Sequence, residues 1–283
     1  MKLILCFTVV VIMILTGISA RAQGTLALYN NFESKYLDPE RWFGVVSITT
    51  GGSMLESVRQ IKTEPTYGSK GLYFSYRGYG DTSSDSGAPR LINRLTIADG
   101  GNIATIQGKV LVKKAEAIGC STPGSDDTDV EARIGGFFFS TSLTPTPGDA
   151  TDDVIATISL RRLSSSTSKP NELEVIGSAF HCSNANCTTG AAVGTDQNLG
   201  TVLLGKRVKL QITWDPQNDR FIFQKGKNPG VNLSYSPLSD TSAPGTLNGG
   251  LKRLEVFEHV ANCTSQPRPV GYMEVYFDDI FTD

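Results

Sequence analysis

Apolar and polar residues alternate in short runs along most of the chain. The clearest run is residues 208–214, in which every second residue from Val208 to Trp214 is apolar and those between are Lys, Gln and Thr. A period of two with one apolar face is typical of a half-buried strand. The turn-forming residues 215–219 follow, and Phe221 and Phe223 resume the pattern. The sequence therefore predicts a β-hairpin here.

Similar runs rich in β-branched and aromatic residues recur between clusters of Gly, Pro, Ser, Asn and Asp. We expect a strand near residues 58–62, where a helical turn over 54–60 is the alternative. Further strands are expected over residues 71–77, 104–115, 130–140, 154–163, 172–182, 207–214, 220–224, 252–263 and 272–281. No long amphipathic helix, internal repeat or linker interrupts them, so the pattern predicts one all-β sandwich domain over residues 23–283.

Long polar segments separate these strands. Residues 78–89, 121–129, 144–153 and 188–198 are rich in Asp, Ser, Thr and Gly. Such segments are loops, and loops on a rigid scaffold often carry binding residues, although they also serve as plain connectors.

The first 22 residues have the pattern of an export signal. Lys2 precedes an apolar run from Leu3 to Leu15, and Ala20-Arg21-Ala22 supplies a cleavage pattern. The run is shorter than the ~20 residues that span a bilayer, which argues against an uncleaved anchor. We expect residues 1–22 to be a signal peptide and the mature protein to be secreted, to the periplasm or beyond.

The charge balance excludes some partners. The chain has 26 basic and 28 acidic residues, a net charge of −2. Loss of Lys2 and Arg21 with the signal makes the balance slightly more acidic. There is no basic stretch for nucleic acid or anionic lipid. We therefore expect no nucleic-acid partner and no membrane insertion after cleavage.

Four cysteines remain beyond the signal: Cys120, Cys182, Cys187 and Cys263. Four cysteines allow three pairings, and an exported chain favours disulfides over a zinc site, which would also need a different spacing. The turn-forming Ser-Asn-Ala-Asn between Cys182 and Cys187 favours a local bridge, which leaves Cys120 to pair with Cys263.

Three stretches together resemble a known superfamily. They are Asn-Phe-Glu-Ser at 31–34 with Leu-Asp-Pro-Glu-Arg-Trp at 37–42, the hairpin at 205–224, and the closing segment 274–281 with Phe-Asp-Asp-Ile. With Gly-Gly-Phe-Phe-Phe at 135–139, they resemble the concanavalin A-like lectin and glucanase (laminin-G-like) superfamily, in a secreted bacterial branch. The resemblance spans nearly the whole mature chain and implies a single jelly-roll β-sandwich of two antiparallel sheets.

This superfamily contains lectins, carbohydrate-binding modules, adhesion domains and glycan-cleaving enzymes, so the fold alone does not fix the activity. The glucanase members carry E-x-D-x-x-E on one strand, which supplies an acid and a nucleophile. That spacing is absent here. The nearest groupings, at residues 127–131 and 172–174, lack the third carboxylate and are interpreted as solvent-facing. The two histidines, His181 and His259, lack a G-x-S-x-G elbow. The sequence thus predicts no catalytic residue.

The resemblance also implies a metal. Related sandwiches often hold one structural Ca²⁺ between the first and last strands, through a carboxylate from each. The matching positions are Glu33 and Asp278. Hard oxygen ligands suit Ca²⁺, although Asp278 could equally end the last strand without an ion.

Sugar binding in such folds needs aromatic platforms and planar polar groups. Tyr76, Arg77, Tyr79, Asp81 and Arg90 lie in and around one long loop and offer both. Core packing of these aromatics is the alternative interpretation.

Our first hypothesis is a secreted, non-catalytic carbohydrate- or surface-binding sandwich with a polysaccharide or glycan partner. The alternatives are a polysaccharide hydrolase or lyase with a rearranged site, and an adhesion module that binds protein at the cell surface.

Overall fold

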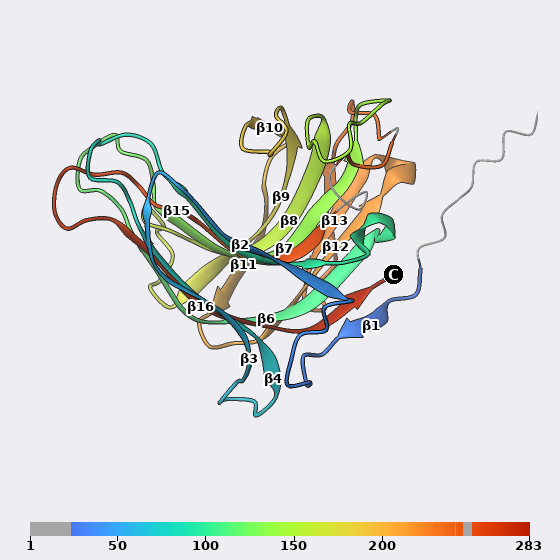
Figure 1. Cartoon of the computed structure of the whole chain (residues 1–283), viewed down its shortest axis with the longest axis horizontal. Helices are drawn as coiled ribbons and strands as arrows, with labels where there is room; N and C mark the ends of the chain where they lie inside the picture. The colour runs from blue at the N-terminus through green and yellow to red at the C-terminus, as the bar shows by residue number, and fades with distance from the viewer. Residues whose placement is uncertain (1–23, 241, 246–250) are drawn as a thin grey trace, which may run out of the picture.

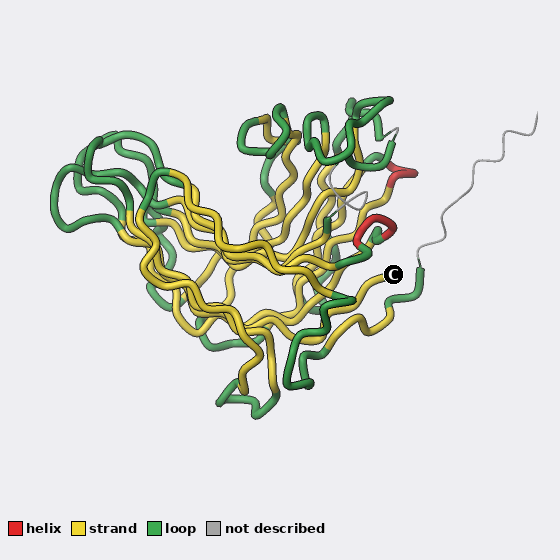
Figure 2. The backbone as a smooth tube through the Cα atoms, in the orientation of Figure 1, coloured by secondary structure: helices red, strands yellow, loops and turns green. Residues whose placement is uncertain are grey.

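Two antiparallel sheets lie face to face, and both are strongly curved (Figure 1). The computed structural model describes residues 24–240, 242–245 and 251–283, and the expected signal peptide lies outside the described residues. Strands make up most of this part of the chain, and the helices within it are short 3₁₀ turns such as Gly100–Asn102 and Pro216–Asn218 (Figure 2). None of the described helices is long and apolar enough to cross a bilayer.

The sheet on the outside of the curve is called the convex sheet. Its strands run in the order β14 (Val231–Ser234), β13 (Arg220–Lys225), β12 (Val208–Asp215), β6 (Thr105–Ile118), β16 (Val270–Thr282), β4 (Lys70–Tyr79) and β3 (Ser53–Thr63), with β1 (Ala27–Asn30) pairing with β16.

The sheet on the inside of the curve is called the concave sheet. Its strands run in the order β10 (Gly190–Ala192), β9 (Glu172–Cys182), β8 (Asp153–Leu163), β7 (Asp129–Ser140), β15 (Lys252–His259), β5 (Arg90–Ile97) and β2 (Trp42–Thr50), with β11 (Gln197–Leu203) pairing with β9.

The chain crosses repeatedly from one sheet to the other. β4 and β6 belong to the convex sheet, whereas β5 and β7, which follow each of them, belong to the concave sheet. Strands that are neighbours in a sheet are therefore often distant in sequence. Two antiparallel sheets joined in this way form a jelly-roll β-sandwich, and the expected fold class is confirmed.

Every strand expected from alternation overlaps an observed one, including β3 around residues 58–62. The expected hairpin is β12 and β13, whose residues pair from Leu210 with Lys225 to Asp215 with Arg220. Leu210 and Ile212 face the core, as does Phe221 on the returning strand. Asp219 closes the turn in the left-handed backbone region, at φ 47°, a conformation that Asp tolerates better than most residues.

β5 is among the strands that the alternation did not indicate. Its sequence places Leu91 and Leu95 toward the core, yet the opposite face also carries an apolar residue, Ile92. Apolar side chains on both faces obscure the period of two. The expected strand at 252–263 ends at His259, and the Val260 N–H donates to the carbonyl of Pro89 instead of to a strand.

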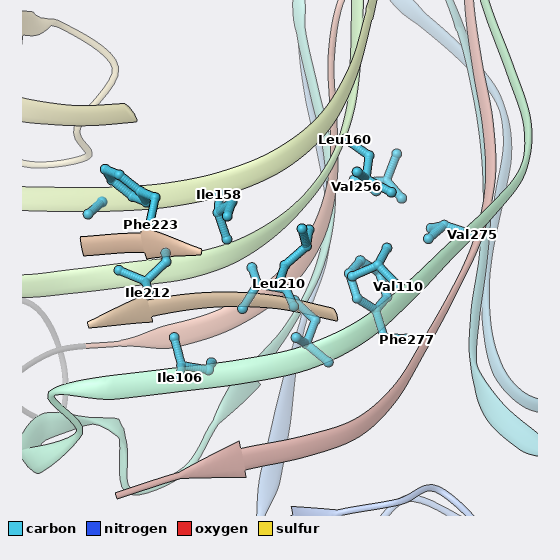
Figure 3. Close-up of a cluster of buried hydrophobic side chains, with 14 of the residues drawn as sticks. Ile106, Val110, Ile158, Leu160, Leu210, Ile212, Phe223, Val256, Val275 and Phe277 are labelled. Atoms are coloured by element: carbon cyan, nitrogen blue, oxygen red, sulfur yellow. The ribbon is translucent and has the colours of Figure 1, made fainter. Parts of the chain in front are cut away.

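The core fills the space between the sheets (Figure 3). Side chains from both layers interdigitate there, and each buried one contributes about 1.5–3 kcal/mol to folding. A Cβ on Gly177 of β9 would lie 2.3 Å from the ring of Phe223, so only glycine allows the sheets this close approach. The cluster drawn includes Ile106, Val110, Ile158, Leu160, Leu210, Ile212, Phe223, Val256, Val275 and Phe277.

Both expected disulfides are present. Cys120, after β6, bonds to Cys263, ahead of β16, with 5.6 Å between their Cα atoms. Cys182, the last residue of β9, bonds to Cys187, with 4.9 Å between their Cα atoms. The first bridge joins distant parts of the chain, and the second closes one short loop.

Candidate functional site

A pocket of about 520 Å³ lies on the exposed face of the concave sheet. β5, β7, β15, β8 and β9 supply its floor, and the loop closed by the Cys182–Cys187 disulfide supplies a wall. Its volume is in the range of small-ligand sites. Apolar rings and polar groups both line it, among them Phe137, Phe180, Phe257, Thr157, Ser178 and Asn186.

Strand alternation places these side chains. On β15, Leu254 and Val256 point into the core, so Arg253, Glu255 and Phe257 point to the other face of the sheet. The same rule on β7 sends Val130 and Ala132 inward and Glu131 and Arg133 toward the pocket. In the strand register, Phe257 of β15 lies between Glu131 of β7 and Ile92 of β5, so residues from three strands lie side by side.

Arg133 is the centre of a buried charge network. Its guanidinium donates to both carboxylate oxygens of Glu131, at 2.8 and 2.7 Å, and lies 3.5 Å from the carboxylate of Glu255. It also stacks on Phe257, with the guanidinium carbon 3.4 Å from the ring centroid. Glu255, fully buried, pairs in addition with Arg253 at 2.9 Å. Such bidentate pairs are among the stronger polar contacts in proteins.

Arg161 of β8 is paired at the side of the pocket. It lies 3.2 Å from the carboxylate of Glu174 and 3.8 Å from that of Asp196. The Glu174 side chain is 20 % exposed. Arg161 is therefore, after Arg133 and Arg253, the third arginine of the pocket that has a carboxylate partner.

Arg90 and Arg94 of β5 differ from these three. Arg90 donates to the carbonyl of Cys187 at 3.1 Å, and its Nε, like that of Arg94, is buried with no hydrogen-bond partner among the described residues. Within the described part of the chain, neither guanidinium lies within 4.0 Å of a carboxylate oxygen. Two cations of the pocket floor are therefore available to a ligand.

Two neighbouring carboxyl groups of β7 have opposite pKa shifts. Burial and the nearby negative charge of Glu131 raise the pKa of Asp129 far above its usual range, so this group keeps its proton at neutral pH. Burial also acts to raise the pKa of Glu131, but the charge and hydrogen bonds of Arg133 outweigh it and hold that pKa low. The pair therefore carries one negative charge.

In the register of the concave sheet, His259 of β15 lies opposite Asp129 of β7 on one side and opposite Arg90 of β5 on the other. Burial, followed by the positive charges of Arg133 and Arg90, lowers the pKa of His259 to about 4. The imidazole is consequently neutral at pH 7. In that state one ring nitrogen donates a hydrogen bond and the other accepts one.

The structure separates the five sugar-binding residues expected from the sequence. Arg90 lines the pocket. Tyr76 is fully buried in the core between the sheets, so its ring cannot serve as an exposed platform. Arg77 faces the other side of the convex sheet, where it pairs with Glu56 at 3.5 Å. Tyr79 lies under Arg268, and Asp81 accepts a hydrogen bond from the amide of Ser83 in the following loop.

The two carboxylates expected to bind calcium already have protein partners. Glu33 is exposed and accepts a hydrogen bond from the Lys70 amide at 3.1 Å. Asp278 lies 3.4 Å from the guanidinium of Arg207, which a cation at this carboxylate would have to displace. Calcium at these residues stays a prediction. A melting curve with and without a chelator tests it, because an ion bound only to the folded state raises the melting temperature.

Among the described residues, three potential metal ligands converge at Asp85, Cys120 and Cys263. Both cysteines of this group form a disulfide, which removes them as thiolate ligands.

Sequence reasoning missed most of the pocket floor. The grouping at 127–131 was interpreted as solvent-facing, but Glu131 is only 6 % exposed, which corrects that interpretation. The available signal was the alternation of charged residues at 129, 131 and 133 and at 253 and 255 within otherwise apolar strands. Charged residues at every second position of a strand with an apolar opposite face indicate a polar, partly covered surface.

No family model and no curated protein matches the chain. Among solved structures, the chain is similar to the potassium-bound carbohydrate recognition domain of Emp46p, with 12 % identity over 89 % of this chain and 96 % of that one and a TM-score of 0.35. It is also similar to the catalytic domain of an endo-1,3-β-glucanase (laminarinase) from Thermotoga petrophila RKU-1, with 13 % identity over 91 % and 97 % and a TM-score of 0.45. A third is the laminarinase from Flavobacterium sp. UMI-01, with 12 % identity over 89 % and 96 % and a TM-score of 0.41. Likenesses this distant say nothing about the activity of this chain.

Proposed function

We propose that this protein is a secreted, carbohydrate-binding β-sandwich and that its pocket on the concave sheet binds a glycan. The observation that carries the proposal is the pocket itself, which combines aromatic rings with hydroxyl, amide and charged groups on a rigid sheet. A pyranose ring has apolar faces and a polar edge, and such a mixed lining complements both.

Secretion is supported by the two disulfides, because such bonds form in oxidising compartments. The charge network supports a preformed site. The ion pairs of Arg133 and Arg161 hold the floor side chains in place before a ligand arrives, which lowers the entropy cost of binding.

A second candidate function is cleavage of a polysaccharide. It is favoured by Asp129 and Glu131, since two adjacent carboxyl groups with opposite pKa shifts are an acid-base arrangement used by enzymes. Against it, both oxygens of Glu131 are already occupied by Arg133. A carboxylate clamped in this way is a weak base and a poorly placed nucleophile, so binding without cleavage is the better-supported function.

The test is a pull-down of the full mature protein on a panel of insoluble and immobilised polysaccharides, with product release scored in the same tubes. We expect retention without products. Products would establish the enzymatic alternative, and their loss in Glu131→Gln would assign the residue. A protein retained by no polysaccharide would contradict the proposal.

A pair of matched variants locates the site. Ser178 lies half-buried on the pocket floor, 3.1 Å from the hydroxyl of Thr157, and Ser178→Tyr would fill the pocket. Gln211 is equally half-buried on β12, on the outer face of the convex sheet, and Gln211→Tyr is the control. Retention should fall at least tenfold in the first variant and stay unchanged in the second.

A further inference from the structure

Five arginines line the pocket, and no lysine does so among the described residues. The whole chain is slightly acidic, with a net charge of −2, so this concentration of cations is local. A guanidinium is planar and donates paired hydrogen bonds that match a carboxylate or a sulfate, which an ammonium group cannot do. A pocket lined by arginine and not by lysine therefore favours recognition of an anion with several oxygen acceptors, such as a carboxylate or a sulfate.

The pairing of these arginines identifies the two that would meet the ligand. Arg133 and Arg253 share the buried carboxylates of the floor, and Arg161 pairs at the side with Glu174 and Asp196. Arg90 and Arg94 have no carboxylate partner within the described residues. Both are partly buried, where the lower dielectric strengthens their interaction with an anion.

The carboxylates of the pocket cancel only part of the positive charge that an incoming anion would meet. Glu131 is covered by the bidentate contact with Arg133, and Glu255 lies fully buried beneath the surface of the floor. Asp129 is neutral because burial and Glu131 raise its pKa. Asp196 is half-exposed at the side and pairs with Arg161.

The two arginines without a carboxylate partner are spread along one strand. Arg90 and Arg94 lie on the same face of β5 with Ile92 between them. Positions four residues apart on a strand are separated by about 13 Å. They therefore offer two points of contact along an extended ligand, with the apolar side chain of Ile92 and the ring of Phe257 between the charges.

We infer that the ligand of this pocket is an anionic glycan, whose carboxylate or sulfate groups are bound by Arg90 and Arg94. This inference rests on the proposed function, since it names the class of glycan that the same pocket takes. The neutral hydroxyls of the ligand would meet Thr157, Ser178 and the neutral imidazole of His259.

The test compares glycans that share a backbone and differ in charge. Oligomers of β-1,4-linked glucose are titrated into the full mature protein, next to the same oligomers oxidised to carboxylates at C6 and sulfated at O6. Polygalacturonate and its methyl ester form a second matched set. We expect the charged member of at least one set to bind at least tenfold more tightly than the neutral one, and more weakly as salt is raised. The two charged arms distinguish carboxylate from sulfate.

Variants tie the charge preference to the two arginines. Arg90→Gln and Arg94→Gln should each weaken binding of the charged glycan by ten- to a hundredfold and leave any binding of the neutral one unchanged. Arg220→Gln is the control, because this arginine is also partly exposed but lies on the convex sheet. Near-native circular dichroism and melting temperature establish that each variant is folded.

The outcomes separate the inference from the proposed function. Equal or stronger binding of the neutral member of each set would overturn the inference and leave the carbohydrate-binding function standing. Binding of no glycan, charged or neutral, would contradict the proposed function. A charge preference that survives in both arginine variants would also overturn the assignment of Arg90 and Arg94.

Discussion

Glu258 and His259 are consecutive residues of β15, yet their side chains lie on opposite sides of the concave sheet. Glu258 is fully buried between the two sheets, where a Cβ on Gly271 would come within 3.0 Å of its carboxylate. His259 lines the pocket on the other face. One strand thus contributes a titratable group both to the core and to the candidate site, and the two can be changed separately.

Glu258→Gln should stabilise the protein at neutral pH. Burial raises the pKa of Glu258 well above its usual value, so the folded state keeps a proton that the unfolded chain releases near pH 4.5. The stability from this group is present below that pH and is lost as the pH rises, by up to ~1.4 kcal/mol per pH unit. In urea unfolding at pH 4.5 and 8, the free energy of unfolding of the variant relative to wild type should be higher at pH 8 than at pH 4.5. An equal response from Glu116→Gln, an exposed position, would contradict the assignment.

Lys252→Met should remove a pH dependence of the opposite sign. The ammonium group is buried, 3.3 Å from the carbonyl of Gly100 and bonded to that of Phe137, and burial lowers the pKa of Lys252 to about 7. The unfolded chain binds the proton up to a pKa of 10.5, so wild-type stability rises with pH between these values. Unfolding measured at pH 6.5 and 9.5 should give a smaller rise in the variant. Lys206→Met, at an exposed site, should keep the wild-type rise.

The two disulfides should differ in their effect on stability. In the chain-entropy model, the Cys120–Cys263 bridge, with a sequence separation of 143, stabilises by about 5 kcal/mol. The same model gives about 2 kcal/mol for Cys182–Cys187, with a separation of 5. Denaturant unfolding of the two double Cys→Ser variants measures this difference. Equal losses would contradict the model.

Loss of the Cys182–Cys187 bridge should instead affect the pocket. The loop that it closes contributes to the lining, and its Cys187 carbonyl accepts a hydrogen bond from Arg90. We expect the Cys182→Ser/Cys187→Ser variant to bind glycan at least tenfold more weakly while remaining folded. Wild-type affinity in that variant would show that the loop is not part of the site.

The Glu131–Arg133 pair should be strongly coupled. Arg133→Gln leaves Glu131 and Glu255 as buried charges with one partner fewer, which costs about 3–5 kcal/mol of unfolding free energy. The double variant with Glu131→Gln and Arg133→Gln should lose less unfolding free energy than the sum of the two single variants. The reason is that the double variant no longer contains the charge of Glu131, which Arg133→Gln alone leaves unpaired. A double-mutant cycle by urea unfolding measures the coupling, and strict additivity would refute it.

Local sequence determined much of the fold. The alternation from Val208 to Trp214 fixed both a strand and the face that it buries, because successive side chains of a strand must point to opposite sides. The short spacing of Cys182 and Cys187 and the expected export signal likewise favoured the observed disulfides. These features depend on neighbours in the chain, and a single sequence reports them directly.

Only the tertiary structure decided where the site lies. Arg90, Phe257 and Glu131 come from three distant segments, and strand pairing across the jelly roll brings them together. Alternation gave Phe257 and Glu131 a face but did not indicate the strand of Arg90, and it could not say which sheet is concave or which face is covered. One tyrosine of the expected sugar site shows the same limit, since Tyr76 lies on the core face of its strand. A pocket depends on curvature and on contacts between remote strands, and neither is encoded in the period of one strand.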